Sequence, residues 1–272
     1  MIADGYSPRR LLLGETWVPD PERMAAYYGR DDELQLAFNF PFAFAEFGAR
    51  RLASIVERTL AALPPGGCPA WMGSNHDIGR FPSRWCGGDE RKIRLALLVL
   101  ATLPGTTVLY YGDEIGMTDV DVPAELRRDR ATLDRGADRN RDRARTPMPW
   151  DSSPTGGFTG SGVTPWLPFG DLQTGSVADQ RADPGSTLWL CRRLLALRHA
   201  ELADGIAGYE QLPAPEGQWA YRVGSLVVAA NFSGRPTDMP AAAGEVVLAT
   251  STGPIAPHDP LPPWQGIVAR LS

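Results

Sequence analysis

The hydrophobic positions of this chain alternate between short apolar runs and longer stretches with helical spacing. Four apolar runs bounded by glycine, proline or polar residues predict strands, at residues 10–14, 34–40, 71–74 and 106–111. A stretch with apolar residues at helical spacing follows each run and predicts helices, at residues 20–28, 46–63, 89–103 and 186–199. Strand-then-helix units in succession are typical of a parallel sheet with right-handed crossovers, so the first part of the chain is predicted to be of the α/β class.

The pattern changes twice after the fourth predicted strand. Residues 113–185 are rich in proline, glycine, aspartate and arginine without a sustained period, and such a long loop inside a compact domain is usually functional. From about residue 204 the apolar runs become short and alternating, which predicts antiparallel strands at residues 219–223, 226–232, 246–249 and 267–271. We therefore expect a division into residues 1–203 and residues 204–272, the second part being a small β domain.

Composition narrows the classes of function. The chain has 272 residues, 43% of them hydrophobic, and a formal net charge of −5, so it can bury a sizeable core and offers no basic surface to nucleic acid. No apolar run is long enough to span a membrane, and the first ten residues lack the apolar core of a signal peptide. The three cysteines form no CxxC pair, which favours neither a disulfide framework nor a zinc site. We expect a cytoplasmic protein that binds a neutral small molecule.

Two predicted strands end in carboxylate side chains. Glu15 lies in the run LLLGETW, and Asp77 follows His76 in WMGSNHDIGR. Neighbouring parallel strands deliver such groups to one edge of a sheet, where barrel enzymes carry their active sites, so the arrangement suggests a pair of catalytic carboxylates. The alternative is that each acid caps the helix after its strand. Spacing alone leaves both interpretations open.

Two further motifs contain acidic residues whose pattern favours structural roles. The run from Arg127 to Arg145 nearly balances its charges and contains no aromatic residue, which indicates a solvated, salt-bridged loop rather than a nucleic-acid arm. Its acids at Asp134, Asp138 and Asp142 do not have the spacing of a calcium loop. Asp113 in Gly112-Asp113-Glu114 is either catalytic or a residue that holds its loop through backbone N–H groups.

Five phrases together resemble one enzyme family: LLLGETW, FNFPF, SNHDIGR, LPGTTVLYYGDEIGM and RDRARTPMPWD. They resemble the α-amylase family of glycoside hydrolases, in the branch of α-glucosidases and oligo-1,6-glucosidases. The resemblance covers essentially the whole chain in the family's order. It implies that residues 1–203 form the C-terminal half, strands 5–8, of a (β/α)8 TIM barrel, with the long loop at 113–185. It also implies that residues 204–272 form a small antiparallel β-sandwich domain.

The resemblance implies a retaining hydrolase that acts on short α-linked gluco-oligosaccharides. Glu15 matches the general acid/base, and Asp77 matches the aspartate that binds sugar hydroxyls and stabilises the oxocarbenium-like transition state. No metal ligand and no organic cofactor are implied, and the calcium ion of some relatives stays a possibility without a placed site. The implied substrate-binding residues are His76, Arg80, Trp17 and Phe40. For Trp17 and Phe40, packing in the core is the alternative to stacking on a sugar.

One departure from the family affects the expected activity. A retaining enzyme needs a nucleophilic carboxylate about 5 Å from the acid, and the family carries it in a phrase of the type GFRxD, which this sequence lacks. Asp4, the acid upstream of Glu15, lies in a turn-like context and is not assigned this role. We therefore expect a truncated form that is inactive alone and has the missing N-terminal half of the barrel as its partner. The alternatives are a non-catalytic binding or scaffold protein and a glucosyl-transferring relative. The preferred linkage is not encoded in these motifs.

Overall fold

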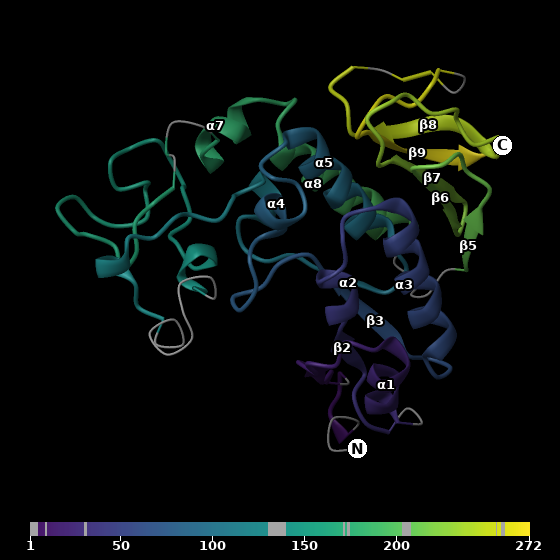
Figure 1. Cartoon of the computed structure of the whole chain (residues 1–272), viewed down its shortest axis with the longest axis horizontal. Helices are drawn as coiled ribbons and strands as arrows, with labels where there is room; N and C mark the ends of the chain where they lie inside the picture. Colours follow the sequence, from purple (N-terminus) through teal and green to yellow (C-terminus); the bar gives the residue numbers. More distant parts are fainter. Residues whose placement is uncertain are drawn as a thin grey trace. The chain divides into compact units, whose positions relative to one another are not determined.

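The computed structural model separates the chain into two compact units. Unit 1 contains residues 1–73, 98–108 and 194–272, and unit 2 contains residues 74–97 and 109–193. The ranges that the structure describes are 5–8, 10–29, 32–129, 140–170, 172, 175–202, 208–253, 255–256 and 259–272. Two helices, α5 (Glu90–Thr102) and α8 (Thr187–Glu201), contribute residues to both units. The elements are labelled in Figure 1.

The predicted parallel sheet is confirmed and lies in unit 1. Its four strands pair in sequence order, all parallel: β1 (Leu13–Gly14), β2 (Leu36–Phe38), β3 (Cys68–Met72) and β4 (Thr106–Val108). Strands β1, β2 and β4 are shorter than predicted, whereas β3 begins three residues earlier than the expected start at Trp71. Trp71 instead lies inside the strand, fully buried, where its indole Nε1 donates a hydrogen bond of 2.6 Å to the carbonyl of Pro104. The bulky side chain thus lies within β3 rather than at its start.

The main helices agree with the predicted positions. Helix α1 (Pro21–Ala25) is capped by Asp20, whose side chain accepts from the backbone N–H of Arg23, and continues into the 3-10 helix η2 (Ala26–Tyr28). Helix α3 (Ala49–Ala62) buries Leu52, Ile55 and Val56, which are among the apolar residues that predicted it. The remaining short helices were not predicted: α2 (Phe40–Ala43), α4 (Phe81–Arg84), α7 (Val177–Ala182), η3 (Asp113–Ile115), η4 (Ala124–Leu126) and η6 (Asp142–Ala144). Among the described residues, no helix combines the length and apolar character needed to cross a membrane.

The C-terminal residues form the predicted antiparallel strands. The five-stranded sheet has the order β5-β6-β7-β9-β8, and its strands are β5 (Tyr209–Leu212), β6 (Gln218–Val223), β7 (Leu226–Asn231), β9 (Gly266–Leu271) and β8 (Ala243–Ala249). Within unit 1 it contacts the helices of the parallel sheet. The hydroxyls of Thr102 in α5 and Tyr221 in β6 are hydrogen-bonded at 2.6 Å, and the rings of Phe47 and Phe232 are 4.9 Å apart. These contacts hold the small sheet and the parallel sheet in one compact unit.

Candidate active site

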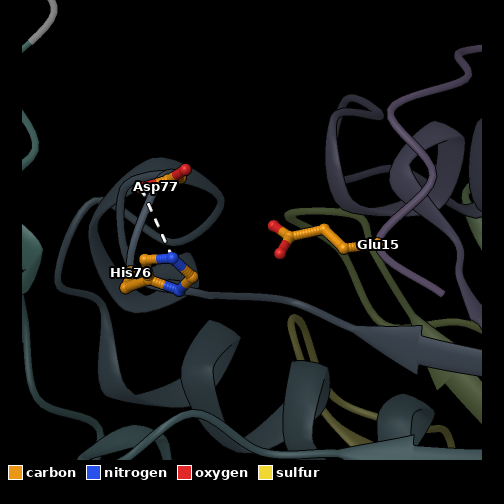
Figure 2. A group of neighbouring side chains, drawn as sticks. All are labelled: Glu15, His76 and Asp77. Carbon is orange, nitrogen blue, oxygen red and sulfur yellow. Dashed lines mark ion pairs between the residues drawn. The ribbon is translucent and has the colours of Figure 1, made fainter. Parts of the chain in front are cut away.

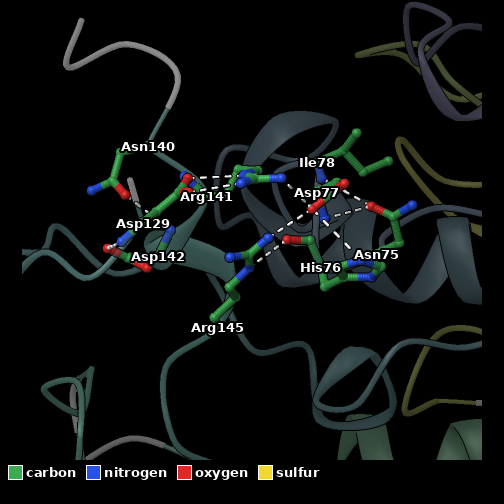
Figure 3. A network of polar contacts seen from close by, with 9 residues as sticks. All are labelled: Asn75, His76, Asp77, Ile78, Asp129, Asn140, Arg141, Asp142 and Arg145. Carbon is green, nitrogen blue, oxygen red and sulfur yellow. Dashed lines mark hydrogen bonds and ion pairs between the residues drawn. The ribbon is translucent and has the colours of Figure 1, made fainter. Parts of the chain in front are cut away.

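The loop after β3 carries the predicted His76 and Asp77 and is shaped by bonds between side chains and backbone. The Asn75 Oδ1 atom accepts from the backbone N–H groups of Asp77, at 2.8 Å, and Ile78, at 2.9 Å (Figure 3). The hydroxyl of Ser74 accepts from the backbone N–H of Phe81 at 2.8 Å. Asparagine and serine side chains commonly stabilise turns in this way, so the conformation of the loop is encoded locally.

Two arginines and a histidine lie close to one carboxylate oxygen of Asp77. Its Oδ1 atom accepts from Arg141 Nη1 at 2.9 Å and from Arg145 Nη2 at 2.7 Å, and His76 Nε2 lies 3.6 Å away (Figures 2 and 3). The side chain of Asp77 remains 29% exposed, and that of His76 is 56% exposed. Asp77 does not cap the helix that follows, because the N-cap position of α4 is occupied by Arg80. The carboxylate is therefore both anchored and open to solvent.

Glu15 lies in unit 1, directly after β1, with an exposed side chain (Figure 2). It does not cap α1, since that role belongs to Asp20. Two residues on, Trp17 is 58% exposed, and its ring contacts those of Phe40, at 4.5 Å between centroids, and Phe44, at 5.1 Å. Phe40 is buried at 1% exposure, whereas Phe44 is 47% exposed. Phe44 was not predicted, although it lies only four residues after Phe40.

Arg80 occupies the interior of unit 2. Its side chain is fully buried, and its guanidinium donates to the backbone carbonyls of Tyr111 and, at 3.0 Å, Ala144. The guanidinium carbon lies 4.9 Å from the ring centroid of Tyr110 and 4.5 Å from that of Tyr111. The backbone N–H of Arg80 donates to Asp119 at 2.9 Å. These contacts join the loop after β3 to the segment after β4.

Asp113 holds its loop, as one of the two sequence interpretations predicted. It is fully buried, accepts a 2.7 Å bond from the hydroxyl of Ser74, and accepts a 3.0 Å bond from the backbone N–H of Tyr110. Burial raises the pKa of this carboxyl to about 7, because desolvation outweighs the hydrogen bonds that favour its charged form. Asp113 thus connects the start of the His76–Asp77 loop to the end of β4.

The raised pKa of Asp113 predicts a pH-dependent stability. An aspartate whose native pKa exceeds its ordinary 3.8 stabilises the fold fully below that ordinary value, and the contribution is lost as the pH rises through about 7. We expect the free energy of unfolding to fall between about pH 4 and about pH 7, and to fall less steeply in Asp113→Asn. Urea denaturation across this range measures the slope. The exposed Asp121→Asn is the matched control, and equal slopes for all three proteins would contradict the assignment.

The arginines that bind Asp77 were missed by the sequence analysis. They belong to the charged run from Arg127 to Arg145, whose predicted salt bridges are confirmed in its described part by the pair of Arg141 and Asp129 at 2.7 Å. The run is not simply solvated, since Asp129 is 6% exposed and Asp142 is 1% exposed. The Asp142 Oδ2 atom accepts hydrogen bonds from two backbone N–H groups, so this carboxylate stabilises the loop. Asp134, Asp138 and Asp4 lie outside the described residues.

The sequence matches two family models. Residues 2–205 match the model described as "Alpha amylase, catalytic domain", and residues 204–268 match "Domain of unknown function (DUF3459)". The first match covers most of the chain. The boundary between the two matches coincides with the change from the α/β pattern to the short alternating strands.

Two sequence relatives and one solved structure agree with the match to the alpha-amylase catalytic domain. The chain is 36% identical to the salivary alpha-glucosidase of Aedes aegypti over 258 residues, covering 86% of this chain and 43% of that protein. It is 34% identical to the alpha-glucosidase of Apis mellifera over 208 residues, covering 72% and 35%. The alpha-glucosyl transfer enzyme XgtA superposes with a TM-score of 0.84 at 26% identity, covering 97% of this chain and 51% of that chain. The chain thus spans about half or less of the length of each match, and it belongs to the α-amylase family of glycoside hydrolases.

Proposed function

We propose that this chain carries the acid/base and transition-state-binding part of a retaining α-glucosidase for short α-linked gluco-oligosaccharides. One observation supports this most directly: Glu15 and Asp77 follow β1 and β3 of one parallel sheet, and both are accessible to solvent. Carboxyl ends of parallel strands share an edge of the sheet, where barrel enzymes carry their active sites. We interpret the sheet as strands 5–8 of the barrel, in a domain of residues 1–203, and residues 204–272 as the family's β-sandwich domain.

The proposed roles follow from exposure and contacts. Glu15, as general acid, protonates the glycosidic oxygen, and its carboxylate then removes a proton from the attacking water. Asp77 accepts hydrogen bonds from sugar hydroxyls, and the exposed His76 donates to the same sugar. The ring of Trp17 stacks on the next sugar and itself packs against the ring of the buried Phe40. Arg80 is a positioning residue, because its guanidinium is buried against backbone carbonyls.

The retaining mechanism needs one more group. The glycosyl-enzyme forms on a second carboxylate about 5 Å from the acid, and the sequence contains no phrase of the type GFRxD that would supply it. We propose that this nucleophile is supplied by a segment outside these 272 residues. Turnover then depends on completion of the site, and the chain alone binds sugar without cleaving it.

The test compares the chain alone with a completed enzyme. The chain is co-expressed with the nucleophile-bearing N-terminal part of the Aedes aegypti relative, and release of nitrophenol from 4-nitrophenyl α-glucoside is measured. We expect no turnover above the uncatalysed rate without the added segment and clear turnover with it. Turnover by the chain alone that disappears in Glu15→Gln would overturn the external nucleophile. Absence of turnover in a co-purified, folded complex would overturn the hydrolase proposal.

Glucosyl transfer is the second candidate, favoured by the similarity to the alpha-glucosyl transfer enzyme XgtA over 97% of this chain. Both reactions share the covalent intermediate and differ in whether water or a sugar hydroxyl attacks it. Incubating the completed enzyme with 4-nitrophenyl α-glucoside and excess cellobiose, a β-linked acceptor that an α-glucosidase does not hydrolyse, distinguishes them. Free glucose equal to the nitrophenol released indicates hydrolysis, whereas trisaccharide formed at the expense of glucose indicates transfer.

A further inference from the structure

Three hydrogen bonds tie both ends of the loop of residues 74–81 to the segment after β4. The hydroxyl of Ser74, where the loop starts, accepts from the backbone N–H of Phe81, where it ends, at 2.8 Å. The same hydroxyl donates to Asp113 Oδ1 at 2.7 Å, and Asp113 Oδ2 accepts from the backbone N–H of Tyr110 at 3.0 Å. Ser74, Phe81 and Asp113 are each at most 1% exposed. Water therefore replaces these bonds only when the loop opens.

Closing this network is linked to a proton on Asp113. Burial raises the pKa of Asp113 to about 7, whereas a carboxyl that meets water in an opened loop titrates near the ordinary value of 3.8. The closed loop is therefore weakened as the pH rises from about 4 to about 7, because the charged carboxylate is hydrated only in the open form. The network is most stable when Asp113 is neutral.

The charged and titratable groups that face Asp113 come from α4, η3 and α8. Arg80, at the N-cap of α4, and Arg84 inside it favour the charged carboxylate, Glu114 of η3 disfavours it, and Cys191 of α8 lies near it. Burial lowers the pKa of Arg84 to about 10 and raises the pKa of Cys191 to about 12, so neither group changes charge between pH 4 and pH 8. All four groups are kept in Asp113→Asn, so this variant isolates the proton of Asp113.

We propose that Ser74 and Asp113 form a proton-controlled latch, which positions the loop carrying His76 and Asp77 and opens as Asp113 loses its proton. The latch holds the backbone at both ends of the loop. It therefore orients His76 and Asp77 as a supporting contact and not as a sugar-binding one. The effect of the latch on sugar cleavage rests on the proposed function, whereas its opening does not.

The first test follows amide hydrogen exchange in the full chain and needs no turnover. Protection factors of the Phe81 and Tyr110 amides, corrected for the intrinsic pH dependence of exchange, are measured from pH 5 to pH 7. We expect both to fall by about 10- to 100-fold in the wild type, which is the change that linkage to a carboxyl with these two pKa values produces. In Asp113→Asn, whose side chain cannot ionise, both should be independent of pH.

The amide of Trp150 is the internal control, because it donates at 2.8 Å to the carbonyl of Gly156 in the same unit. Its protection factor should not change over this range. An equal fall at Trp150 would show that the whole unit opens, and constant protection at Phe81 and Tyr110 would show that the loop does not respond to the proton. Either result would overturn the latch.

Ser74→Ala gives a second readout if Asp113→Asn fails to fold. It removes the hydroxyl that joins Phe81 to Asp113, so protection at Phe81 should fall at every pH. Ser153→Ala is the matched control, since its hydroxyl accepts from a backbone N–H in another turn of the same unit, at 3.2 Å. Equal protection at Phe81 in the two serine variants would overturn the latch.

The second test asks whether the latch positions the active site. For the completed enzyme, kcat/KM for maltose is measured from pH 5 to pH 7 in the wild type and in Asp113→Asn. We expect the ratio of wild type to variant to fall by about 2- to 10-fold with rising pH, mostly through kcat, because small displacements of active-site groups slow catalysis. A constant ratio would overturn the positioning role. Exchange that depends on pH as expected, together with an inactive wild-type complex, would overturn only the hydrolase proposal.

Discussion

Glu15→Gln should lower kcat/KM of the completed enzyme for maltose by about 10²- to 10⁴-fold, which is the usual contribution of a general acid/base. Glutamine keeps the size of the side chain but neither delivers nor removes a proton. The decrease in kcat/KM should be smaller for 4-nitrophenyl α-glucoside than for maltose, since nitrophenolate leaves without being protonated when the glycosidic bond breaks. Initial rates with both substrates measure this difference. We expect the Glu15→Gln chain to fold normally, because Glu15 is exposed directly after β1 and surface substitutions rarely disturb a fold.

The control for this experiment is Glu57→Gln, which changes an exposed glutamate of α3 in the same unit. Its rates on both substrates should equal those of the wild-type complex. A Glu15→Gln complex that cleaves maltose at the wild-type rate would remove Glu15 from the mechanism. An equal loss on both substrates would leave Glu15 in the site but would exclude proton donation as its main contribution.

Arg80→Ala should lower the free energy of unfolding by roughly 2 to 6 kcal/mol, because two backbone carbonyls lose the guanidinium as donor, at about 1–3 kcal/mol each. The carbonyl of Tyr111 loses its donor, that of Ala144 keeps only a 3.5 Å contact from the Tyr111 hydroxyl, and the tyrosine rings lose the cation that stacks on them. Arg80→Lys should recover only part of the loss, since a single ammonium lacks the planar fork that bridges two acceptors. Urea denaturation followed by tryptophan fluorescence measures these differences.

The matched control for Arg80 is the exposed Arg181 of α7, in the same unit. Arg181→Ala should change the free energy of unfolding by less than about 0.5 kcal/mol, as is usual for surface positions. A similarly small effect of Arg80→Ala would mean that water satisfies the two carbonyls, and Arg80 would then return to its sequence-based assignment as a substrate contact.

The elements that were predicted are those that bury a continuous apolar surface. The parallel strands and helices such as α3 have runs long enough for a period to be recognised. Helices α2 and α4 have four residues each, which is about one turn and shows no period. Both begin with Phe-Pro, and proline in the first turn is the signal that could have identified them. Strand β5 was missed because its two central residues are exposed polar side chains.

In the candidate site, the sequence pointed to His76 and Asp77 because they are adjacent at the end of an apolar run. It could not indicate that Arg141 and Arg145 bind Asp77 from positions 64 and 68 residues away. In a run with balanced charges, every arginine has several acids within reach, so the sequence does not specify which pairs form. The family resemblance placed Arg80 at a sugar, and only tertiary contacts reveal that two backbone carbonyls and two aromatic rings surround it.

Strand β1 ends the parallel sheet, and the three leucines at residues 11–13 are 45% to 63% exposed. An edge strand offers unpaired N–H and C=O groups to any extended peptide, and exposed leucines add an apolar surface beside them. A peptide that adds to this edge in parallel register would gain main-chain hydrogen bonds and cover the leucines at once. Purified material should therefore self-associate as its concentration rises, and a nucleophile-bearing segment that pairs with β1 should act as a solubilising partner.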